Sequence, residues 1–307
     1  MTSIHFVGDV VAGRPILDAV AALSGASLAG ISGPAEPCAR AARERAVPFV
    51  PLERLTAPQG PQDGGDAPDL VVNFNSTVLF GEALLAWPRL GAINFHPGPL
   101  PEYAGLHVWQ WGILRGEREF GATIHRMVPA IDAGDVVAVA RFPIAATDTG
   151  LTLYMKTLRA GTDLLCCVIG EIAATGRLAG TPQDLSRRRY YPRRPPYDGV
   201  LSWTWTARQI VDFVRALAYR PFTSPSAPPV TFFREKPLEP ARAAVGPDPG
   251  PGFAPGVVVD IAAQGVLTVC GEGQTVLLRE LVRDGRAFPA ARIAQEIGLG
   301  VGDVLGR

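Results

Sequence analysis

Hydrophobic and polar positions in the first part of the chain alternate in a way that separates short strands from helices. Short apolar runs bounded by glycine or polar residues predict strands. These strands are expected at 3–7, 26–31, 47–50, 69–74 and 91–95. Apolar positions with helical spacing predict helices at 16–23 and 38–45. This alternation favours a mainly parallel α/β sheet with helices on both faces, in which ligands bind at the carboxyl ends of the strands.

The pattern changes twice further along the chain. Two β-rich runs at 122–127 and 135–142 precede a long helix that ends near residue 176. Residues 180–199 then combine four prolines with five arginines, a composition typical of a linker. Helices are expected at 207–217 and 290–297. Between them, short strands are expected at 230–233, 256–261, 265–270 and 275–281. Strands at this spacing favour a small β-barrel or half-barrel.

Composition indicates a folded protein of two domains. The 307 residues are 47% hydrophobic and 19% charged, which is compatible with a sizeable core. We therefore expect an α/β domain at 1–180, a linker at 181–204 and a β-rich domain at 205–307. Basic and acidic residues both number 29, so net charge provides no attraction to nucleic acid or anionic membranes.

The N-terminal segment and the cysteines indicate a cytoplasmic protein. The start, MTSIHFVGDVVAG, lacks the basic region and the long apolar run of a signal peptide. The chain contains no apolar stretch of the roughly 18 residues that a membrane span requires. Its four cysteines form no C-x-x-C motif, so we expect reduced, mostly buried thiols.

The stretch NFHPGPLPEYAG, which begins at Asn94, carries the first candidate chemistry. Asn94 and His96 are two positions apart on a predicted strand, so their side chains leave the same face. Pro97 ends the strand, which places the pair where an open α/β sheet holds its ligands. A lone histidine could simply be a hydrogen-bonded turn residue. The asparagine on the same face and the rigid loop favour a functional role.

An acidic group follows in GATIHRMVPAIDAGD, where a strand leads into a loop with Asp132 and Asp135. An asparagine amide can donate a hydrogen bond to a developing oxyanion, and a histidine can do the same or relay protons. An aspartate can receive the proton of an attacking amine. Asn94, His96 and an aspartate without a serine or cysteine nucleophile therefore suit direct acyl transfer to an amine.

Other chemistries are disfavoured. The histidines at 5, 96, 107 and 125 form no H-E-x-x-H motif, so no metal site is expected. The glycines after the first strand form neither G-x-G-x-x-G nor a P-loop. The arginines of 187–194 are interpreted as a solvated linker rather than as a phosphate or RNA site.

Three spaced motifs stand out when these residues are considered together. N-x-H-P-x-x-L-P-x-Y-x-G starts at Asn94, G-x-T-x-H-x-M spans 121–127, and I-D-A-G-D spans 131–135. This combination, with its spacing, resembles the formyltransferases that use 10-formyltetrahydrofolate. YYPRRPPYDGVLSW at 190–203 and the segments after it resemble the linker and C-terminal domain of two-domain members, including methionyl-tRNA formyltransferase. The resemblance implies a Rossmann-like catalytic domain and a small OB-like β-barrel.

The resemblance also implies roles for individual residues. Asn94 and His96 would stabilise the oxyanion, and Asp132, rather than Asp135, would pass the amine proton to the folate nitrogen. His125 is not assigned a catalytic role. The co-substrate would be N10-formyltetrahydrofolate, held by two loops near the strand ends. Its expected contacts are Ser76, Thr77, Leu79, Val128, Ala130 and Ile131.

The acceptor is expected to be the amine or hydroxylamine of a small metabolite, contacted by Tyr103, Ala104 and His107. The Y-A-G form of this loop is similar to members that formylate amino-acid or peptide-type substrates. Members that act on nucleotide sugars are the alternative. Methionyl-tRNA formyltransferases carry a longer basic loop where this chain has the mixed-charge segment 32–45, so tRNA is disfavoured. Hydrolysis of the formyl-folate and a homodimer stay open, whereas the intact Asn/His/Asp set argues against a non-catalytic binding module.

Overall fold

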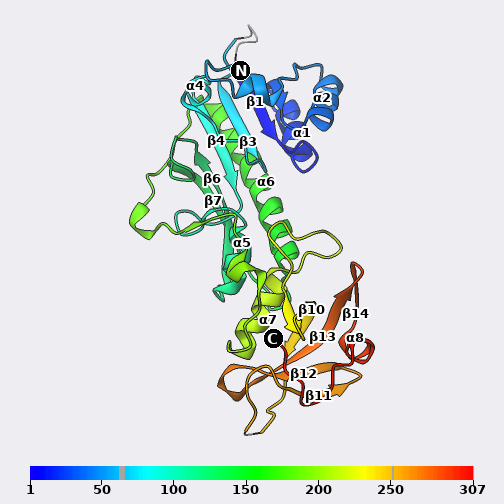
Figure 1. Cartoon of the computed structure of the whole chain (residues 1–307). Coiled ribbons are helices and arrows are strands. Elements are labelled where there is room, and N and C mark those ends of the chain that lie inside the picture. The colour runs from blue at the N-terminus through cyan, green and yellow to red at the C-terminus, as the bar shows by residue number, and fades with distance from the viewer. Residues whose placement is uncertain (62–65, 251, 307) are drawn as a thin grey trace. The chain divides into compact units, whose positions relative to one another are not determined.

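Apolar residues at alternate positions build a six-stranded sheet in the computed structural model, which describes residues 1–61, 66–250 and 252–306 (Figure 1). The strand order is β2-β1-β3-β4-β6-β7. The strands are β1 (Thr2–Gly8), β2 (Ala26–Ser32), β3 (Leu70–Phe74), β4 (Gly91–His96), β6 (Glu119–Arg126) and β7 (Val136–Pro143). The first four in this order are parallel, and β6 and β7 are antiparallel to their neighbours. The expected mainly parallel sheet is confirmed.

One expected strand is wrong. Residues 47–50 make only a single parallel bridge, between Phe49 and Ile31 of β2. Pro48 and Pro51 flank this bridge, and neither has an N–H to extend a ladder. The segment therefore lies beside the sheet edge without becoming a regular strand.

Helices cover both faces of this sheet. On one face, α1 (Arg14–Ala22), α2 (Ala35–Glu44) and the long α6 (Gly150–Thr175) pack against β1, β3 and β4 around Phe6, Val72 and Ile93. On the other face, α3 (Leu52–Leu55) and α4 (Glu82–Leu85) pack around Val7 and Val71. Successive side chains of a strand point to opposite faces, which explains this division.

The same alternation gathers polar side chains on one face of the sheet. The residues that pack toward α6 include Val72, Ile93, Phe95 and Ile124. The side chains between them therefore point to the opposite face. These side chains are Asn73, Asn94, His96, Thr123 and His125.

The second half of the chain forms an antiparallel sheet in the order β11-β12-β13-β10-β9, with β14 paired to β13. Its elements are α7 (Ala207–Ala216), β9 (Thr231–Phe233), β10 (Lys236–Val245), β11 (Val258–Ala262), β12 (Gly265–Val269), β13 (Thr275–Arg283), β14 (Arg286–Pro289) and α8 (Ala290–Ile297). This sheet confirms the predicted half-barrel class. Sequence reasoning missed β10, because Pro237, Pro240 and its charged residues are unusual in a strand.

The chain divides into two compact units. The first contains residues 1–108, 119–143 and 155–191, and the second contains 109–118, 144–154 and the residues from 192 onward. The second unit thus takes in α5 (Val108–Leu114) almost entirely, and also the start of α6. The expected domain limits of 1–180, 181–204 and 205–307 stay a prediction. No helix within the described ranges is long and apolar enough to cross a membrane.

Candidate active site

Hydrogen-bonded strand pairing brings the polar side chains of the sheet into one row. Asn73 on β3 is the register partner of Asn94 on β4. Asn94 in turn pairs with His125 on the antiparallel β6, and His96 pairs with Thr123. Because β4 ends at His96, the row lies at the carboxyl end of that strand.

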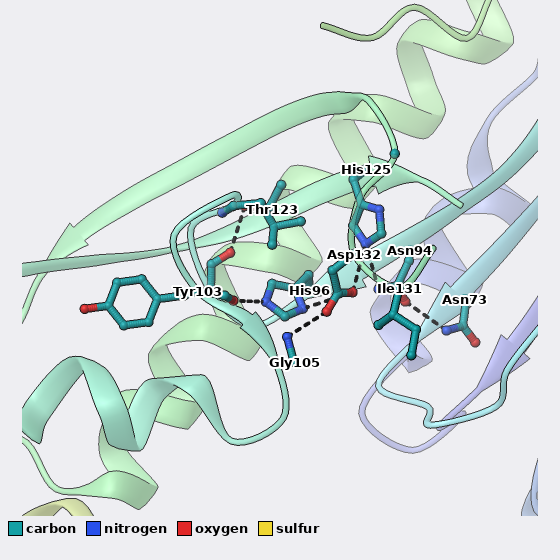
Figure 2. Close-up of polar contacts among 12 residues, drawn as sticks. Asn73, Asn94, His96, Tyr103, Gly105, Thr123, His125, Ile131 and Asp132 are labelled. Carbon is teal, nitrogen blue, oxygen red and sulfur yellow. Dashed lines mark hydrogen bonds and ion pairs between the residues drawn. The ribbon is translucent and has the colours of Figure 1, made fainter. Parts of the chain in front are cut away.

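Thr123 fixes the proline-containing loop that follows β4. Its fully buried hydroxyl donates a hydrogen bond to the carbonyl oxygen of Gly98 at 2.8 Å and accepts one from the Leu100 N–H at 3.2 Å. Tyr103, at the far end of the loop, returns to His96 through its main-chain oxygen (Figure 2). The loop is therefore held at both ends by the polar row.

His96 is buried, with 2% of its surface exposed. Its Nε2 lies 2.5 Å from the carbonyl oxygen of Tyr103. A carbonyl oxygen only accepts hydrogen bonds, so Nε2 carries the hydrogen and donates it. In the neutral ring, Nδ1 is then a lone-pair acceptor, and it faces Oδ1 of Asp132 at 3.6 Å. His96 and Asp132 are therefore arranged so that a proton can be held between Nδ1 of the histidine and Oδ1 of the aspartate.

Asp132 enters the row from the loop between β6 and β7 (Figure 2). Its φ of 52° is in the left-handed region, which is uncommon for a residue with a side chain. Its Oδ2 accepts a hydrogen bond from the Gly105 N–H at 2.8 Å. Its Oδ1 lies 3.5 Å from Nε2 of His125, and 9% of the side chain is exposed. The carboxylate therefore touches both histidines and retains a small path to solvent.

Neighbouring groups set the orientation of the Asn94 amide. Asn73 donates from Nδ2 to Oδ1 of Asn94 at 2.8 Å. His125 donates from Nδ1 to the carbonyl oxygen of Arg126 at 2.8 Å, so the Nε2 of its neutral ring is an acceptor. Nδ2 of Asn94 donates to that Nε2 at 3.1 Å. One amide hydrogen of Asn94 is thereby used, and the second remains for a ligand.

The electrostatics of the site favour a carboxylate beside a neutral imidazole. Burial lowers the pKa of His96, and the opposing attraction of Asp132 is too weak to reverse this. Burial alone would raise the pKa of Asp132, but the His96 and His125 rings and the Gly105 N–H hold it below its ordinary value. Asp132 is therefore ionised at neutral pH, and it can stabilise a proton that arrives on His96.

The residues expected to hold the folate lie on two accessible loops. Leu79 is 70% exposed, Ile131 44% and Val128 41%. Thr77 and Ala130 are also exposed, and Ser76 is half-buried, with its hydroxyl accepting a hydrogen bond from the Val78 N–H. Exposed apolar side chains at the strand ends suit a flat ligand. Their assignment to the folate stays a prediction.

The residues expected to contact the acceptor are less accessible. Tyr103 is buried, and Ala104 has 0% of its surface exposed. His107 is half-buried and has a φ of 54°. The Ala104 side chain packs inside this loop, so an acceptor in this conformation would not reach its methyl group.

Sequence reasoning missed three contributors to the site. His125 was set aside as non-catalytic, although it lies within 3.5 Å of Asp132. Knowledge of the antiparallel register, which pairs His125 with Asn94, would have placed His125 at the site. Asn73 was visible only as one more polar residue in an apolar strand. Gln183, in the expected linker, contacts the Asp132 loop, and no spacing pattern indicates this.

The described residues contain no group of three or more His, Cys, Asp or Glu side chains arranged to hold a metal ion. Among the cysteines, Cys38 and Cys270 are buried, Cys166 is half-buried and Cys167 is exposed. Burial raises the pKa of the Cys38 and Cys270 thiols to about 11. Neither buried thiol is therefore a nucleophile at neutral pH.

Family models match both halves of the chain. The formyl transferase model matches residues 65–169, which include the whole of β3, β4, β6 and β7. The model for the formyl transferase C-terminal domain matches residues 195–297. The chain belongs to the formyl transferase family. Asn94, His96 and Asp132 all lie inside the first matched region.

Solved structures share the fold of this formyl transferase at low identity. An N-formyltransferase from Helicobacter canadensis, in complex with folinic acid and dTDP-3-aminofucose, is 15% identical, with a TM-score of 0.65 over 91% of this chain and 99% of that one. WlaRD, a sugar 3N-formyltransferase, is 15% identical, with a TM-score of 0.65 over 90% of this chain and 97% of that one. HypX from Aquifex aeolicus, in complex with tetrahydrofolic acid, is 18% identical, with a TM-score of 0.61 over 98% of this chain. The chain spans about half the length of HypX, because it covers 48% of that protein.

Proposed function

We propose that this chain is an N-formyltransferase that moves the formyl group of N10-formyltetrahydrofolate to the amine or hydroxylamine of a small metabolite. The observation that carries the proposal is the arrangement of Asn94 and Asp132 around the buried His96. It combines an oriented amide donor with a carboxylate that faces a neutral imidazole at 3.6 Å. Such a set can stabilise negative charge on one side of a reacting carbon and accept a proton on the other.

The reaction follows from the positions of these groups. The acceptor nitrogen attacks the formyl carbon, and the carbonyl electrons move to oxygen. The second hydrogen of the Asn94 amide stabilises this oxyanion, and His96 contributes positive charge only once it has taken up the acceptor proton on Nδ1. The acceptor nitrogen loses its proton to the Asp132 and His96 pair. When the oxyanion collapses, the C–N bond to folate breaks, and the folate nitrogen receives that proton.

The donor is proposed to lie against the exposed apolar side chains of Leu79, Val128 and Ile131, with Ser76, Thr77 and Ala130 beside them. Ile131 immediately precedes Asp132, so a donor on this loop reaches the carboxylate. Two of the similar structures contain tetrahydrofolic acid or folinic acid, which is compatible with this choice of donor. Backbone groups of the two loops would supply polar contacts to the pterin.

Two acceptor classes remain in competition. The Tyr103-Ala104-Gly105 motif favours amino-acid or peptide-type amines, although the burial of Ala104 removes a direct contact from this argument. Amino sugars on nucleotides are the second candidate, because two sugar formyltransferase structures match this chain over at least nine-tenths of both lengths.

Transfer RNA is disfavoured as an acceptor by the pairing of nearby arginines. Arg43 lies 3.5 Å from Glu36, and Arg45 lies 2.6 Å from Asp18. Phosphate contacts need cations that can exchange counterions for the nucleic acid backbone. These two arginines are instead balanced by carboxylates on their own surface.

A panel assay tests the proposal. The wild-type protein is given N10-formyltetrahydrofolate with amino-acid amines, hydroxylamine-bearing amino acids, nucleotide-linked amino sugars or no acceptor. Free tetrahydrofolate and formylated products are then measured by mass spectrometry. We expect a formylated product with one acceptor class. Formate release at the same rate without any amine would replace the proposal by a hydrolase, and no consumption of the donor with any acceptor would overturn it.

A further inference from the structure

Residues 181–191, expected from their composition to begin a linker, lie against the polar row. Thr181 exchanges two backbone hydrogen bonds with Val136, each 2.8 Å long. Further along, Tyr190–Tyr191 (β8) pairs in parallel with Ala104–Gly105 (β5), in the loop after β4. The segment therefore touches the elements on both sides of Asp132.

We infer that Gln183 is a positioning residue for formyl transfer, because it holds the backbone of Asp132 in the conformation that presents its carboxylate to His96. This inference rests on the proposed function of Asp132. Nε2 of Gln183 donates to the carbonyl oxygen of Asp132 at 3.0 Å and to that of Gly134 at 2.6 Å. Both hydrogens of one amide group thus bind the loop that carries the carboxylate.

The loop needs such support because its conformation is unfavourable. Asp132 has a φ of 52°, in the left-handed region that is unfavourable for a residue with a side chain. Two residues later, a Cβ on Gly134 would lie 2.0 Å from the carbonyl oxygen of Arg126. The chain therefore turns tightly here. The two bonds from Gln183 fix the carbonyl groups on either side of the turn.

The orientation of the Gln183 amide is determined by its partners. Both partners are carbonyl oxygens, so only the NH2 group can face them. Oε1 is buried and has no hydrogen-bond partner among the residues that the structure describes. A buried acceptor without a partner costs free energy, so any stabilising contribution of the Gln183 amide comes from its two donor hydrogens.

Residues 183–191 also fix the Gly105 N–H, which binds Oδ2 of Asp132. The Arg189 carbonyl oxygen accepts from the Ala104 N–H at 3.0 Å, and that of Tyr191 accepts from the Leu106 N–H at 2.9 Å. Between these two bonds lies Gly105, whose N–H donates to Oδ2 of Asp132. A Cβ on Gly105 would approach the Tyr191 carbonyl oxygen to 2.1 Å, so the two strands are in close contact.

Arginine side chains reinforce this arrangement. Arg188 donates from Nη2 to the carbonyl oxygen of Ile131 at 2.9 Å, directly before Asp132. Arg187 pairs with Glu102, in the loop that follows His96. Residues 183–191 therefore bind the loop of the carboxylate and the loop of its N–H donor at once. Loss of the Gln183 donors releases the first loop from this segment at its centre.

The test replaces Gln183 by methionine, which keeps the length of the side chain but has no N–H donors. Misplacing a catalytic group by about 1 Å can cost ~10²-fold, so we expect kcat to fall by ~10- to 10²-fold. The KM values for formyl donor and acceptor should change by less than roughly threefold, because Gln183 acts through a group used in the transition state. Hydrogen exchange at the Gly105 amide should become faster.

A double-mutant cycle separates positioning from a general structural role. If Gln183 acts through Asp132, Gln183→Met should cause no further loss of kcat in an Asp132→Asn protein. Gln295→Met, at an exposed position of α8, is the matched control and should leave kcat and Gly105 exchange unchanged.

The outcomes distinguish this inference from the proposed function. Wild-type kcat in Gln183→Met, or a loss that adds in full to that of Asp132→Asn, overturns the positioning role while the function stands. Wild-type kcat in Asp132→Asn itself overturns the proposed function. If Gln183→Met lowers kcat in the wild-type protein but causes no further loss in the Asp132→Asn protein, the result supports both the positioning role and the proposed function.

Discussion

Two buried aspartates, one in each unit, have similar burial and opposite surroundings. Asp212 on α7 is 5% exposed at its side chain and lies 2.6 Å from Nε of Arg215 and 2.8 Å from Nε of Arg208. Asp132 is 9% exposed, and its nearest charged or titratable neighbours are two histidine nitrogens at 3.5 and 3.6 Å. The first carboxylate is neutralised by two guanidinium groups. The second faces one nitrogen of each histidine ring, and in the neutral rings these two nitrogens carry no hydrogen.

The difference distinguishes a carboxylate that is fully paired from the one to which the proposed function assigns the proton. Asp212 and its arginines also fix the start of α6, because Arg215 donates to the Asp148 carbonyl oxygen at 2.8 Å. Both carboxylate oxygens of Asp212 are occupied by guanidinium groups, one by Arg208 and one by Arg215. Asp132 has backbone support on one oxygen and leaves the other facing His96 and His125. The proposed function assigns the transfer of the acceptor proton to this second oxygen.

The largest effect on stability is expected at Asp212. Asp212→Ala leaves Arg215, 12% exposed at its side chain, without its carboxylate. Breaking a buried ion pair from one side typically costs ~3–5 kcal/mol. We expect a loss of that order in the free energy of unfolding, measured by urea denaturation, with unchanged kcat for the folded fraction. A stable variant that has lost activity would reverse the assignment of the two carboxylates.

A second buried group in the first unit gives a pH-dependent effect. His5 contacts the hydroxyl of Ser32 at 2.9 Å, and burial lowers its pKa to about 4. Its ordinary pKa is about 6.5, so the unfolded chain binds a proton there at a higher pH than the folded chain. The contribution of the neutral His5 to the free energy of unfolding is therefore fully present above pH 6.5, and it is lost as the pH falls toward 4.

His5→Gln should remove that dependence. The shift corresponds to about 3 kcal/mol between the two pH values, by the usual conversion of 1.36 kcal/mol for each pKa unit. We expect the free energy of unfolding of the variant to fall less steeply than that of the wild type in this window, by about that amount. Formyl transfer at neutral pH should be unchanged. Parallel curves for both proteins would contradict this prediction, because they would show that folding leaves the pKa of His5 unchanged.

A smaller effect is expected at Asn73, which orients the Asn94 amide without touching Asp132. Asn73→Val removes the donor to Oδ1 of Asn94. The amide can then rotate, and the alignment of its second hydrogen is lost. We expect kcat to fall ~10-fold, equivalent to about 1.4 kcal/mol, at nearly constant KM values. Steady-state kinetics with both substrates varied would measure this, and an unchanged kcat would mean that His125 alone orients Asn94.

Local patterns predicted the elements that carry the site. The alternation of β4 placed Asn94 and His96 on one face, and the loop before β7 supplied Asp132. Neighbouring strands were harder to relate. His125 enters the site only through the antiparallel pairing of β4 and β6, which depends on sheet order rather than on local spacing.

Contacts between distant segments could not be predicted from the sequence. Gln183 lies in a stretch whose prolines and arginines indicated a linker, and it binds a loop about fifty positions earlier in the chain. Similarly, β10 has two prolines and three charged residues, and its pairing with β13 makes it a strand. In both cases tertiary hydrogen bonds override the local composition.

The most direct test of the account is the Asp132→Asn protein, with formyl transfer and stability measured on the same preparation. Asparagine keeps the size of the side chain and can still accept a hydrogen bond from Gly105, but it cannot take the acceptor proton. We predict that single-turnover formyl transfer at neutral pH falls by at least ~10²-fold, while the free energy of unfolding changes by less than about 1 kcal/mol. Transfer within roughly threefold of the wild-type rate would contradict the central claim that this carboxylate carries the proton of the reaction.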